Sequence, residues 1–427
     1  MKPGWGSAPR EEIEARQFER LRSLLAAIVP ANRFYSAKLA TLGQPASLDD
    51  FRRRAPETTK SELIEDQRAN PPWGANLTFP LDRYARYAQT SGTTGVPMRW
   101  ADTPESWQWM LDTWRRVYDA AGVTSADRIF FAFSFGPFLG FWTAFEAASQ
   151  MGALCIPGGG MRSAARLRVI ADTGVTVLCC TPTYAMHLAE EAAAEGVSAR
   201  PASVRMLIVA GEPGGSIAGT RARLKAAWPN AEIVDQHGMT EVGPVTYQCP
   251  ARPGVLHVYE EAYFPEVIHP ATGQQIPRGG EGELVLTNLG RTGSPLLRYR
   301  TGDIVRLSPS DRCQCGSWEM AFEGGIIGRT DDMVVVRGVN VYPSAVDDIV
   351  RASGGVAEYR VRVTTDRSMV ELAMEVEPDG SVDAPALVHR LETALRDSLA
   401  LRIPVAIAAA GSLPRFEMKA RRWVVIP

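Results

Sequence analysis

The sequence predicts an α/β protein. We expect a large N-terminal domain of parallel βαβ layers, a β-rich subdomain within it, and a small α+β C-terminal domain. Between residues 127 and 235, short apolar runs alternate with segments of helical periodicity, which is typical of parallel βαβ units. From about 249 to 327 the apolar runs are separated by turns rich in Gly, Pro and Thr, which favours hairpins or a barrel. Strand-like and helical segments then return, so we predict domains at 1–329 and 330–427.

Bulk composition supports a globular chain and excludes several classes of partner. The chain has 427 residues, of which 45% are apolar and 22% charged, and its formal net charge is −2. This small charge gives no global attraction for nucleic acid or an acidic membrane. The uncharged stretch 129–145 is interrupted by Gly136-Pro137, so it predicts a buried strand, a turn and a helix instead of a membrane span. The first residues lack an apolar run, and we therefore expect a cytoplasmic protein.

The first part of the chain is predicted to be helical. Apolar residues recur at helical spacing from Glu11 to Ile28, which indicates an amphipathic helix. A second helical piece carries Phe34-Tyr35. Ser47 precedes Leu48-Asp49-Asp50-Phe51 and is expected to cap a third helix.

The predicted parallel layers follow from residue 127 onward. We expect strands at 128–133, 153–156, 175–180, 206–210 and 232–235, and helices at 142–151, 163–173, 184–195 and 216–228. Ligands of such sheets bind beyond the carboxyl ends of the strands. The loops after Ala210 and Asp235 are therefore the first places to expect a site.

The remaining elements belong to the β-rich subdomain and the C-terminal domain. Strands of the subdomain are predicted at 255–259, 266–269, 282–287 and 304–307. In the C-terminal domain we predict strands at 333–337, 359–364 and 372–376, and helices at 344–352 and 384–399. The boundary between the domains is expected near residues 330–332.

The segment Thr90 to Pro97 has the composition of a loop that wraps a phosphate chain. Its eight residues include two glycines, a proline and four hydroxyl side chains. Glycine lets backbone N–H groups approach an anion closely, and hydroxyl groups add donors. No Gly-Lys-Ser/Thr follows, so this is not the Walker loop. A polar hairpin turn is the alternative interpretation.

Four further polar clusters follow the loop in order. They are 235–241 (Asp-Gln-His-Gly-Met-Thr-Glu), 299–303 (Tyr-Arg-Thr-Gly-Asp), 328–343 (from Gly-Arg-Thr-Asp-Asp-Met to Asn-Val-Tyr-Pro) and 413–422 (Leu-Pro-Arg-Phe-Glu-Met-Lys-Ala-Arg-Arg). In this order and at these intervals the five segments resemble the adenylate-forming superfamily. Phe34-Tyr35, Thr58-Thr59-Lys60 and the segment 179–185 resemble its phenylacetate–coenzyme A ligase branch. The resemblance covers nearly the whole chain.

The resemblance implies an ATP and AMP site and a role for each segment. In the family pattern, Thr240 would bind the α-phosphate, Glu241 would hold Mg²⁺, and Lys419 would bridge the α-phosphate and the acid. The catalytic residues would then be Thr240, Glu241 and Lys419. Residues expected to bind ATP or AMP are Thr90, Ser91, Gly92, Thr93, Thr94, Gly95, Gly211, Glu212, Pro213, Asp235, Gln236, His237, Thr240, Asp303 and Arg329. Asp331 would be the hinge of a mobile C-terminal domain.

Three positions depart from the family pattern. Met98 follows the proline of the first loop, where the wider superfamily often has lysine. His237 occupies a position usually filled by tyrosine, so contacts with adenine or the acid are expected to differ. Met418 precedes Lys419 where glycine is common, which predicts a stiffer loop.

Four residues have the chemistry of a structural zinc site. Cys313 and Cys315 form a C-x-C turn, and Cys249 and His257 bracket a loop rich in Pro and Gly. Together they supply a tetrahedral set of three thiolates and one imidazole. Members of the phenylacetate ligase branch resemble this arrangement. Three reduced cysteines with an unrelated histidine are the alternative.

The segment 134–142 predicts the class of acid. Its sequence, Ser-Phe-Gly-Pro-Phe-Leu-Gly-Phe-Trp, follows a strand and is rich in aromatic rings and glycines, which suits a planar aryl acid. We expect Ser134, Phe135, Phe141, Gly211 and His237 to line the acid pocket. Ordinary core aromatics are the alternative interpretation.

Together these features predict an AMP-forming aryl-CoA ligase that uses ATP, Mg²⁺ and coenzyme A, with structural Zn²⁺. Its substrate would be a benzoate-, anthranilate- or phenylacetate-type acid. One alternative is an enzyme that passes the activated acid to the phosphopantetheine thiol of a carrier protein. A non-catalytic nucleotide-binding or zinc-dependent interaction protein is another, against which Thr240, Glu241, Asp303 and Lys419 argue together. A homodimer is expected from the resemblance alone.

Overall fold

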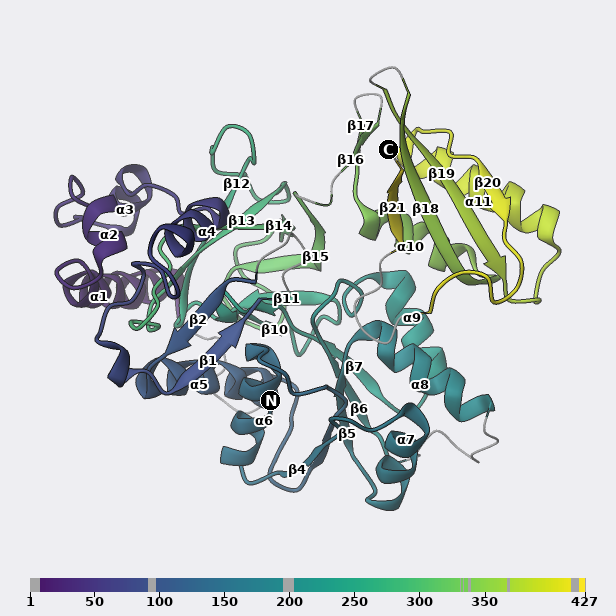
Figure 1. The fold of residues 1–427 in the computed structure, drawn as a ribbon, viewed down its shortest axis with the longest axis horizontal. Coiled ribbons are helices and arrows are strands. Elements are labelled where there is room, and N and C mark those ends of the chain that lie inside the picture. Colours follow the sequence, from purple (N-terminus) through teal and green to yellow (C-terminus); the bar gives the residue numbers. More distant parts are fainter. Residues whose placement is uncertain are drawn as a thin grey trace.

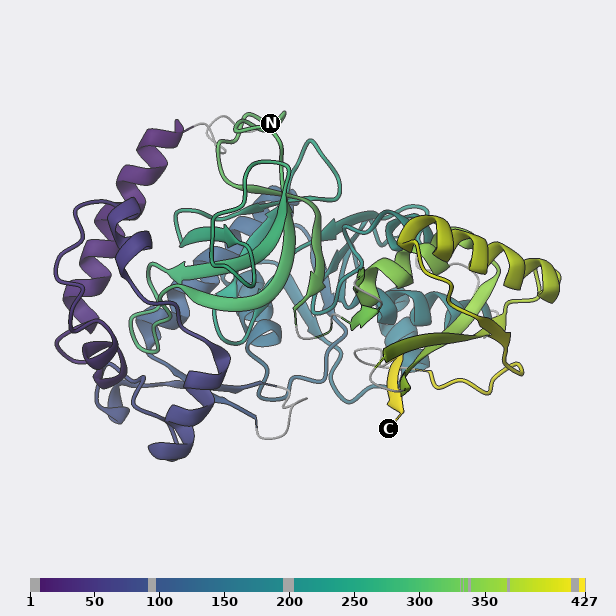
Figure 2. The ribbon, with the colours of Figure 1, turned by 90° about the horizontal axis from the view of Figure 1, so that it is seen from above.

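The computed structural model describes residues 8–90, 97–194, 203–330, 332, 334–336, 339–366, 369–415 and 422–426. The larger part of the chain forms two sheets with their helices, and the last part forms a separate lobe beside them (Figures 1 and 2). The α/β architecture predicted from the sequence is confirmed.

A five-stranded parallel sheet forms the centre of the large domain. Its strands lie in the order β4-β3-β5-β6-β7. They are β3 (Arg128–Phe131), β4 (Leu154–Pro157), β5 (Val177–Cys180), β6 (Met206–Val209) and β7 (Glu232–Asp235). The helices between and after them are α6 (Leu139–Gln150), α7 (Ser163–Asp172), α8 (Pro182–Ala194) and α9 (Ala218–Ala227).

The central strands of this sheet are apolar on both faces. Cys179 and Ile208 pack into one hydrophobic cluster, while Cys180 and Val209 pack into another on the opposite side. Successive side chains of a strand point to opposite faces, so helices on both sides must cover them. The Cys179-Cys180 pair is therefore core, as its apolar setting predicts.

A six-stranded antiparallel sheet forms the β-rich subdomain, in the order β10-β11-β15-β14-β13-β12. Its strands are β10 (Thr246–Gln248), β11 (Val255–Val258), β12 (Tyr263–Ile268), β13 (Glu281–Asn288), β14 (Tyr299–Leu307) and β15 (Ala321–Arg329). The sequence patterns predicted β11 to β14 and missed β10 and β15. A short pair, β8 (Gly238–Met239) and β9 (Gly243–Pro244), precedes this sheet.

The N-terminal helices gather at one end of the molecule, on the left of Figure 1. They are α1 (Arg10–Ile28), α2 (Arg33–Lys38), α3 (Leu48–Arg54) and α4 (Lys60–Ala69). A short turn η1 (Leu81–Arg83), the hairpin β1 (Arg86–Gln89)–β2 (Arg99–Asp102) and helix α5 (Pro104–Ala120) follow. The sequence predicts α1 to α3, with the expected cap at Ser47, but not α4 or α5. The hairpin flanks the segment for which a hairpin turn was the alternative interpretation.

The C-terminal domain has its own sheet, order β20-β19-β18-β21, and its own hydrophobic cluster. Its elements are β16 (Val334–Val336), β17 (Val339–Val341), α10 (Pro343–Ser353), β18 (Val356–Asp366), β19 (Met369–Pro378), α11 (Ala384–Leu399), β20 (Val405–Ile407) and β21 (Trp423–Ile426). The strands and helices predicted for this module are present, and β20 and β21 complete the sheet.

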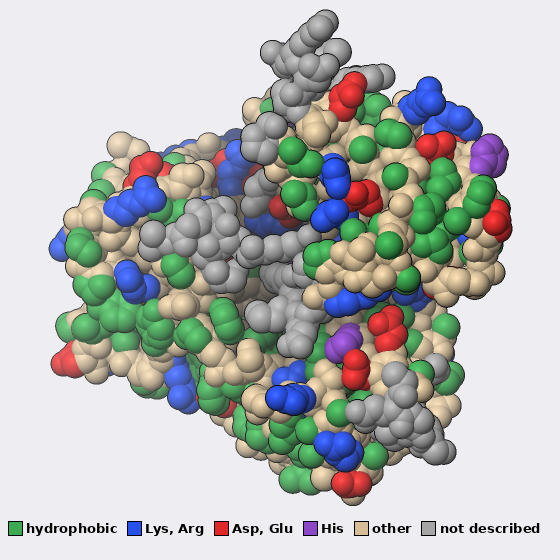
Figure 3. Space-filling view, turned by 45° about the vertical axis from the view of Figure 1, so that its right-hand side comes forward, with side chains coloured by type: hydrophobic (Ala, Val, Ile, Leu, Met, Phe, Trp, Pro, Cys, Tyr) green, Lys and Arg blue, Asp and Glu red, His purple; other side chains and the backbone are tan. Residues whose placement is uncertain are grey.

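The two domains meet where α10 packs on α9. The backbone N–H of Gly219 donates to Oδ1 of Asp348 at 2.9 Å. A Cβ at Gly219 would lie 2.7 Å from that oxygen, so the approach of the helices requires glycine. Acidic and basic side chains lie together along this boundary (Figure 3).

Among the helices of the described residues, none combines the length and the apolar character that a membrane-spanning helix needs.

Candidate active site

Loops that follow the parallel strands lie at one edge of the sheet. Strands β3, β5, β6 and β7 are parallel, so their carboxyl ends meet there. Ser134 follows β3, Gly211 follows β6, and Gln236 and His237 follow β7. These predicted site residues therefore share the edge at which the sequence analysis placed a site.

Asp303 joins two further predicted residues. It lies on β14 and is buried, and its Oδ1 accepts a hydrogen bond from Nη1 of Arg329 at 2.6 Å. Nε2 of His237 lies 3.1 Å from its Oδ2. Although burial opposes ionisation, His237 and Arg329 hold the pKa of the Asp303 carboxyl below its ordinary value. An ionised carboxylate, an acceptor for hydroxyl donors, is thus fixed between two basic side chains.

A second polar group lies at the end of β7. Asp235 is buried, and this burial raises the pKa of its carboxyl to about 6. The Oε1 atom of the neighbouring Gln236 is buried and has no hydrogen-bond partner among the described residues. Buried polar atoms are normally satisfied, so an unpaired amide oxygen here suits a ligand donor.

The loop 211–213 borders the boundary between the domains. Oε1 of Glu212 accepts a hydrogen bond from the backbone N–H of Thr183 at 2.7 Å, which holds the loop against α8. Glu212, Pro213 and Arg329 line a cleft of about 240 Å³ that extends to the C-terminal domain. The cleft joins the segments predicted to flank the nucleotide.

Thr240 and Glu241 lie in the turn between β8 and β9. The Glu241 side chain is buried, and its Oε1 lies 3.5 Å from Nζ of Lys60. Lys60 is the first residue of α4, whose N-terminus is fixed by a capping box between Thr59 and Glu62. In the sequence, Lys60 contributes only to the family resemblance, and it was not predicted to lie in the site. No charge pattern marked it, because its partner is 181 positions away in the chain.

The β1–β2 hairpin flanks the predicted phosphate loop. Thr90 and Met98 are joined by two hydrogen bonds, each of 3.0 Å, one from the Thr90 N–H to the Met98 carbonyl and one from the Met98 N–H to Thr90 Oγ1. The N–H of Gln89 donates to the carbonyl of Pro137 at 2.8 Å, so the hairpin is tied to the aromatic segment. The predicted residues Ser91, Gly92, Thr93, Thr94, Gly95, Asp331 and Lys419 lie outside the described residues.

The aromatic segment forms a cluster beside this hairpin. The rings of Phe133 and Phe141 stack with centroids 4.1 Å apart, and Phe135 packs edge-on against Phe133 at 6.5 Å. The backbone of Phe135 has φ 43°, a strained value for a residue with a side chain, and such strain is concentrated at ligand sites. Helix α6, which carries Phe141, packs against β8 directly after His237. Two of the five predicted pocket residues thus share a cluster, and a third adjoins its helix.

The four predicted zinc ligands converge in the β-rich subdomain. Their ligand atoms all lie within 4.8 Å of one another. The Sγ atoms of Cys249 and Cys313 are 3.7 Å apart, and Sγ of Cys315 lies 3.4 Å from Nε2 of His257. Bonds of 2.3 Å to sulfur and 2.0–2.1 Å to nitrogen give tetrahedral edges of about 3.8 and 3.6 Å. The donor set therefore fits Zn²⁺, and none of the six cysteines forms a disulfide.

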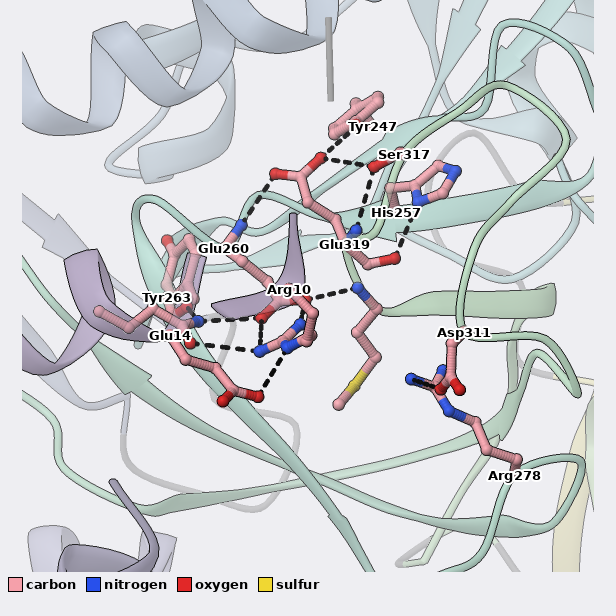
Figure 4. Close-up of polar contacts among 12 residues, drawn as sticks. Arg10, Glu14, Tyr247, His257, Glu260, Tyr263, Arg278, Asp311, Ser317 and Glu319 are labelled. Carbon is pink, nitrogen blue, oxygen red and sulfur yellow. Dashed lines mark hydrogen bonds and ion pairs between the residues drawn. The ribbon is translucent and has the colours of Figure 1, made fainter. Parts of the chain in front are cut away.

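A buried network lies behind this cluster (Figure 4). Nδ1 of His257 lies 3.3 Å from the carbonyl oxygen of Glu319, which orients Nε2 toward the cysteines. The Glu319 carboxyl accepts from the Tyr247 hydroxyl and from the backbone N–H of Glu260. Glu260 in turn pairs with Arg10 of α1 at 2.8 Å. Burial raises the pKa of Glu319. The cluster is thereby connected to the first helix.

Family models match both domains. A model described as AMP-binding enzyme matches residues 48–290, and one described as AMP-binding enzyme C-terminal domain matches residues 338–425. Among curated proteins, the phenylacetate-coenzyme A ligase of Thermus thermophilus is 31% identical, over 97% of each chain. That of Aromatoleum evansii is 30% identical, over 98% of this chain and 95% of the relative.

A solved ligase has the same arrangement of elements. 2-Hydroxyisobutyryl-CoA ligase in the postadenylation state, in complex with R3-HIB-AMP, matches with a TM-score of 0.92 and 28% identity, over 99% of this chain and 91% of that chain. The same ligase in the thioesterification state, with 2-HIB-AMP and CoA, matches with a TM-score of 0.70 and 29% identity, over 98% and 91%. The relative placement of the two domains here is thus closer to the postadenylation state.

Proposed function

Since the chain belongs to the AMP-binding enzyme family and is an AMP-forming acid–CoA ligase, we propose that its acid is an aryl carboxylic acid of the benzoate, anthranilate or phenylacetate type. The enzyme uses ATP to activate the acid and CoA as the acceptor. The ring cluster around Phe133 and Phe141, tied to the hairpin that flanks residues 91–96, carries this proposal. Its flat aromatic wall suits a planar ring better than a long acyl chain.

We propose that the first half-reaction takes place between the β7 edge and the β8–β9 turn. The acid's carboxylate oxygen attacks the α-phosphorus of ATP, and pyrophosphate leaves. Asp303 would accept the ribose hydroxyls, while Gln236 and the loop 211–213 would flank adenine. Residues 90–95 would bind the leaving phosphates. Two anions must meet in this step, so positive charge and alignment are the principal requirements.

Charge neutralisation is assigned to four residues. Thr240 would donate to the α-phosphate. The buried Glu241 carboxylate offers the oxygen ligands that Mg²⁺ prefers, and the ion would offset phosphate charge when bound. Lys60, 3.5 Å from Glu241, adds a positive charge from α4. Lys419 would bridge the acid and the α-phosphate.

We propose that the second half-reaction uses another placement of the C-terminal domain. The CoA thiol attacks the acyl carbon of the adenylate, and AMP leaves. Asp331 would be the hinge of this rotation, which would remove Lys419 and bring residues 338–342 to the site. The two states of 2-hydroxyisobutyryl-CoA ligase support such a movement, since they match this structure unequally.

A substrate panel tests the acid class. ATP–pyrophosphate exchange would be measured with phenylacetate, benzoate, anthranilate, 2-hydroxyisobutyrate and a long-chain fatty acid. We expect the fastest exchange with an aryl acid. The proposal fails if 2-hydroxyisobutyrate or the fatty acid gives the fastest exchange.

Lys419 and the acceptor are tested separately. Lys419→Ala should lower adenylation by about 10²-fold or more, the scale of removing one transition-state charge partner. Thioester formation with free CoA, measured against transfer to a phosphopantetheinylated carrier protein, tests the alternative acceptor. Faster transfer to the carrier would favour that alternative.

We also propose that Cys249, His257, Cys313 and Cys315 hold a structural Zn²⁺. All four positions of a tetrahedral ion would be filled by protein, so the ion would brace two turns of the subdomain and take no part in the reaction. Purified protein should contain about one zinc per chain. Cys313→Ser should lose it and unfold at a lower temperature, whereas the matched variant Cys155→Ser, outside the cluster, should retain it. Intact folding with less than about half an equivalent of zinc would contradict the proposal.

A further inference from the structure

Arg291 is completely buried, with 0% of its surface exposed, in the connection between β13 and β14. Its Nε and Nη2 atoms each lie 2.7 Å from one carboxylate oxygen of Asp102. Its Nη1 donates to two backbone carbonyls, that of Thr240 at 3.0 Å and that of Glu241 at 2.7 Å. The guanidinium also lies over the ring of Trp100 at 5.1 Å.

This pairing is expensive to bury, and a buried ion pair is weak evidence of a role in stability. Asp102 is only 1% exposed, so both charges have lost their hydration. Well-packed apolar residues commonly replace buried ion pairs without loss of stability. Unlike an apolar contact, a bidentate ion pair with two further hydrogen bonds to carbonyls fixes the distances and directions between the groups that it joins.

The two carbonyls belong to the residues assigned to the α-phosphate and the metal ion. Fixing the carbonyl oxygens of Thr240 and Glu241 fixes two successive peptide planes. The Cα atom of Glu241 joins those two planes, so their orientation sets the direction of its Cα–Cβ bond. Arg291 therefore determines the direction in which the Glu241 side chain leaves the backbone. No other described side chain donates to both carbonyls.

Asp102 extends this constraint to the hairpin. It is the last residue of β2 and lies opposite Arg86 of β1 in the strand register, at the base of the hairpin. The other end of the hairpin flanks residues 91–96. The Asp102–Arg291 pair therefore joins the hairpin to the β8–β9 turn through one rigid, planar group. The segments proposed to bind the β- and γ-phosphates and the α-phosphate are held in one frame.

We propose that Arg291 is a positioning residue for the adenylation half-reaction, which holds Thr240 and Glu241 in register with the phosphate-binding hairpin. The inference rests on the proposed function of those residues. Arg291 touches neither substrate and acts through the backbone of the turn. Its loss should therefore impair Mg²⁺-dependent ATP binding and adenylation, and leave the thiol step intact.

Arg291→Lys is the principal variant, because lysine keeps the charge but cannot make the bidentate pair and both carbonyl bonds. We expect ATP–pyrophosphate exchange to fall by about 10- to 100-fold, the scale of a small misplacement of reacting groups. The Mg²⁺ concentration for half-maximal exchange should rise. Conversion of presynthesised acyl-adenylate and CoA to thioester should stay within about twofold of the native rate.

Arg298→Lys is the matched control. Arg298 is also buried, makes a bidentate pair with Glu266 at 2.8 and 3.0 Å, and donates to the carbonyl of Ala55 at 2.6 Å. Its substitution should lower the unfolding temperature without changing the Mg²⁺ requirement. Should Arg291→Lys not fold, Asp102→Asn is measured in the same assays and should show the same shift in Mg²⁺ dependence.

Two outcomes overturn the proposal. One is an unchanged Mg²⁺ requirement in folded Arg291→Lys, and the other is an equal loss in both half-reactions, as a merely structural role predicts. Calorimetric titration of Mg²⁺–ATP into the native enzyme and the variant reports the effect independently of the acid. Failure of the native enzyme to exchange with any acid would instead count against the proposed function.

Discussion

The carboxyl group of Asp235 is buried where its charged form is disfavoured. It lies buried at the end of β7, where burial raises its pKa to about 6. An ordinary aspartic acid ionises near pH 4. Between these two values the folded protein binds a proton that the unfolded chain releases, so the free energy of unfolding falls as pH rises.

Asp235→Asn should therefore stabilise the ligand-free protein in a pH-dependent manner. Below about pH 4 both states of the native protein are protonated, and the variant should gain little. The gain should grow through pH 6 and level off above it, on the order of 3 kcal/mol. Thermal unfolding at several pH values measures it, with the exposed Asp397→Asn as the control. A difference in unfolding temperature that does not change between pH 4 and 8 would refute the assignment.

Asp303 permits a prediction about affinity. Because Asp303 is ionised between His237 and Arg329, Asp303→Asn removes the negative charge that accepts their hydrogen bonds and those of a ligand. We expect ATP affinity to fall by about tenfold or more, since hydrogen bonds to charged groups contribute about 1.5–3 kcal/mol. Calorimetry with ATP measures this. The Glu323→Gln change, in a part-buried pair with Arg252 on the same sheet, should leave ATP affinity unchanged.

Residues with local motifs could be predicted, and residues that act through partners could not. Asp303, His237 and Glu241 stand in short polar segments that the sequence marks, and the structure brings the first two together. Lys60 stands in a segment for which no element was predicted, and Arg291 stands in a loop between two predicted strands. Their partners are remote in the chain, so only the folded backbone identifies them.

At the scale of elements, α4 delivers Lys60 to the site. Thr59 caps this helix with its side chain, and the Glu62 carboxylate accepts a hydrogen bond from the Thr59 N–H at 2.7 Å. The bridge between Thr58 and Tyr299 ties the start of α4 to β14, the strand of Asp303. These contacts fix the N-terminus of α4 and thereby the position of the Lys60 backbone.

Loss of this cap should affect both stability and activity. Thr59→Ala should cost about 1 kcal/mol and, because the first turn of α4 loosens, should also lower pyrophosphate exchange severalfold. Ser47→Ala removes a comparable cap from α3, where Ser47 accepts from the Asp50 N–H at 3.1 Å. Ser47→Ala should lower stability by a similar amount and leave the rate of pyrophosphate exchange unchanged. Equal rates of pyrophosphate exchange in the two variants would show that the cap of α4 does not contribute to adenylation.

Most elements of clear period were predicted, and those of mixed character were not. The parallel strands are apolar runs between turns, and all five were found where expected. Helix α5 was missed, although it buries Trp107, Met110, Leu111 and Trp114 on one face. The β1–β2 hairpin has exposed polar positions and acquires its place from the loops it touches. The hairpin depends on tertiary contacts that local patterns do not record. Helix α5 does carry a local signal, with Thr103 as its cap and Pro104 at its first position, and this signal was overlooked.

At the scale of the whole molecule, Asp348 of the C-terminal domain caps a helix of the large domain. Helix α9 has no side-chain cap of its own, and Asp348 accepts from the Gly219 N–H near its start. The cap exists only while the domains keep this placement, which resembles a postadenylation state.

Asp348→Ala should therefore weaken this placement. A lost cap costs about 0.5–2 kcal/mol, so the first half-reaction should slow by about 2- to 30-fold, while thioester formation from added acyl-adenylate should not slow. Gly219→Ala should act in the same direction. Asp383→Ala is the control, because Asp383 caps α11 within its own domain. Equal slowing of both half-reactions by Asp348→Ala would contradict the assignment.

The tie between α1 and the β-rich subdomain has a consequence for how the chain is made. Arg10 bonds to Glu260, 250 positions further along, and Leu21 and Leu24 share a core with Phe264 and residues beyond it. A ribosome must therefore synthesise more than half of the polypeptide before this first helix can dock. Until then its apolar side is covered only in part, by α2 and α3. Nascent or truncated chains that stop short of β12 therefore expose an apolar surface that chaperones would have to shield.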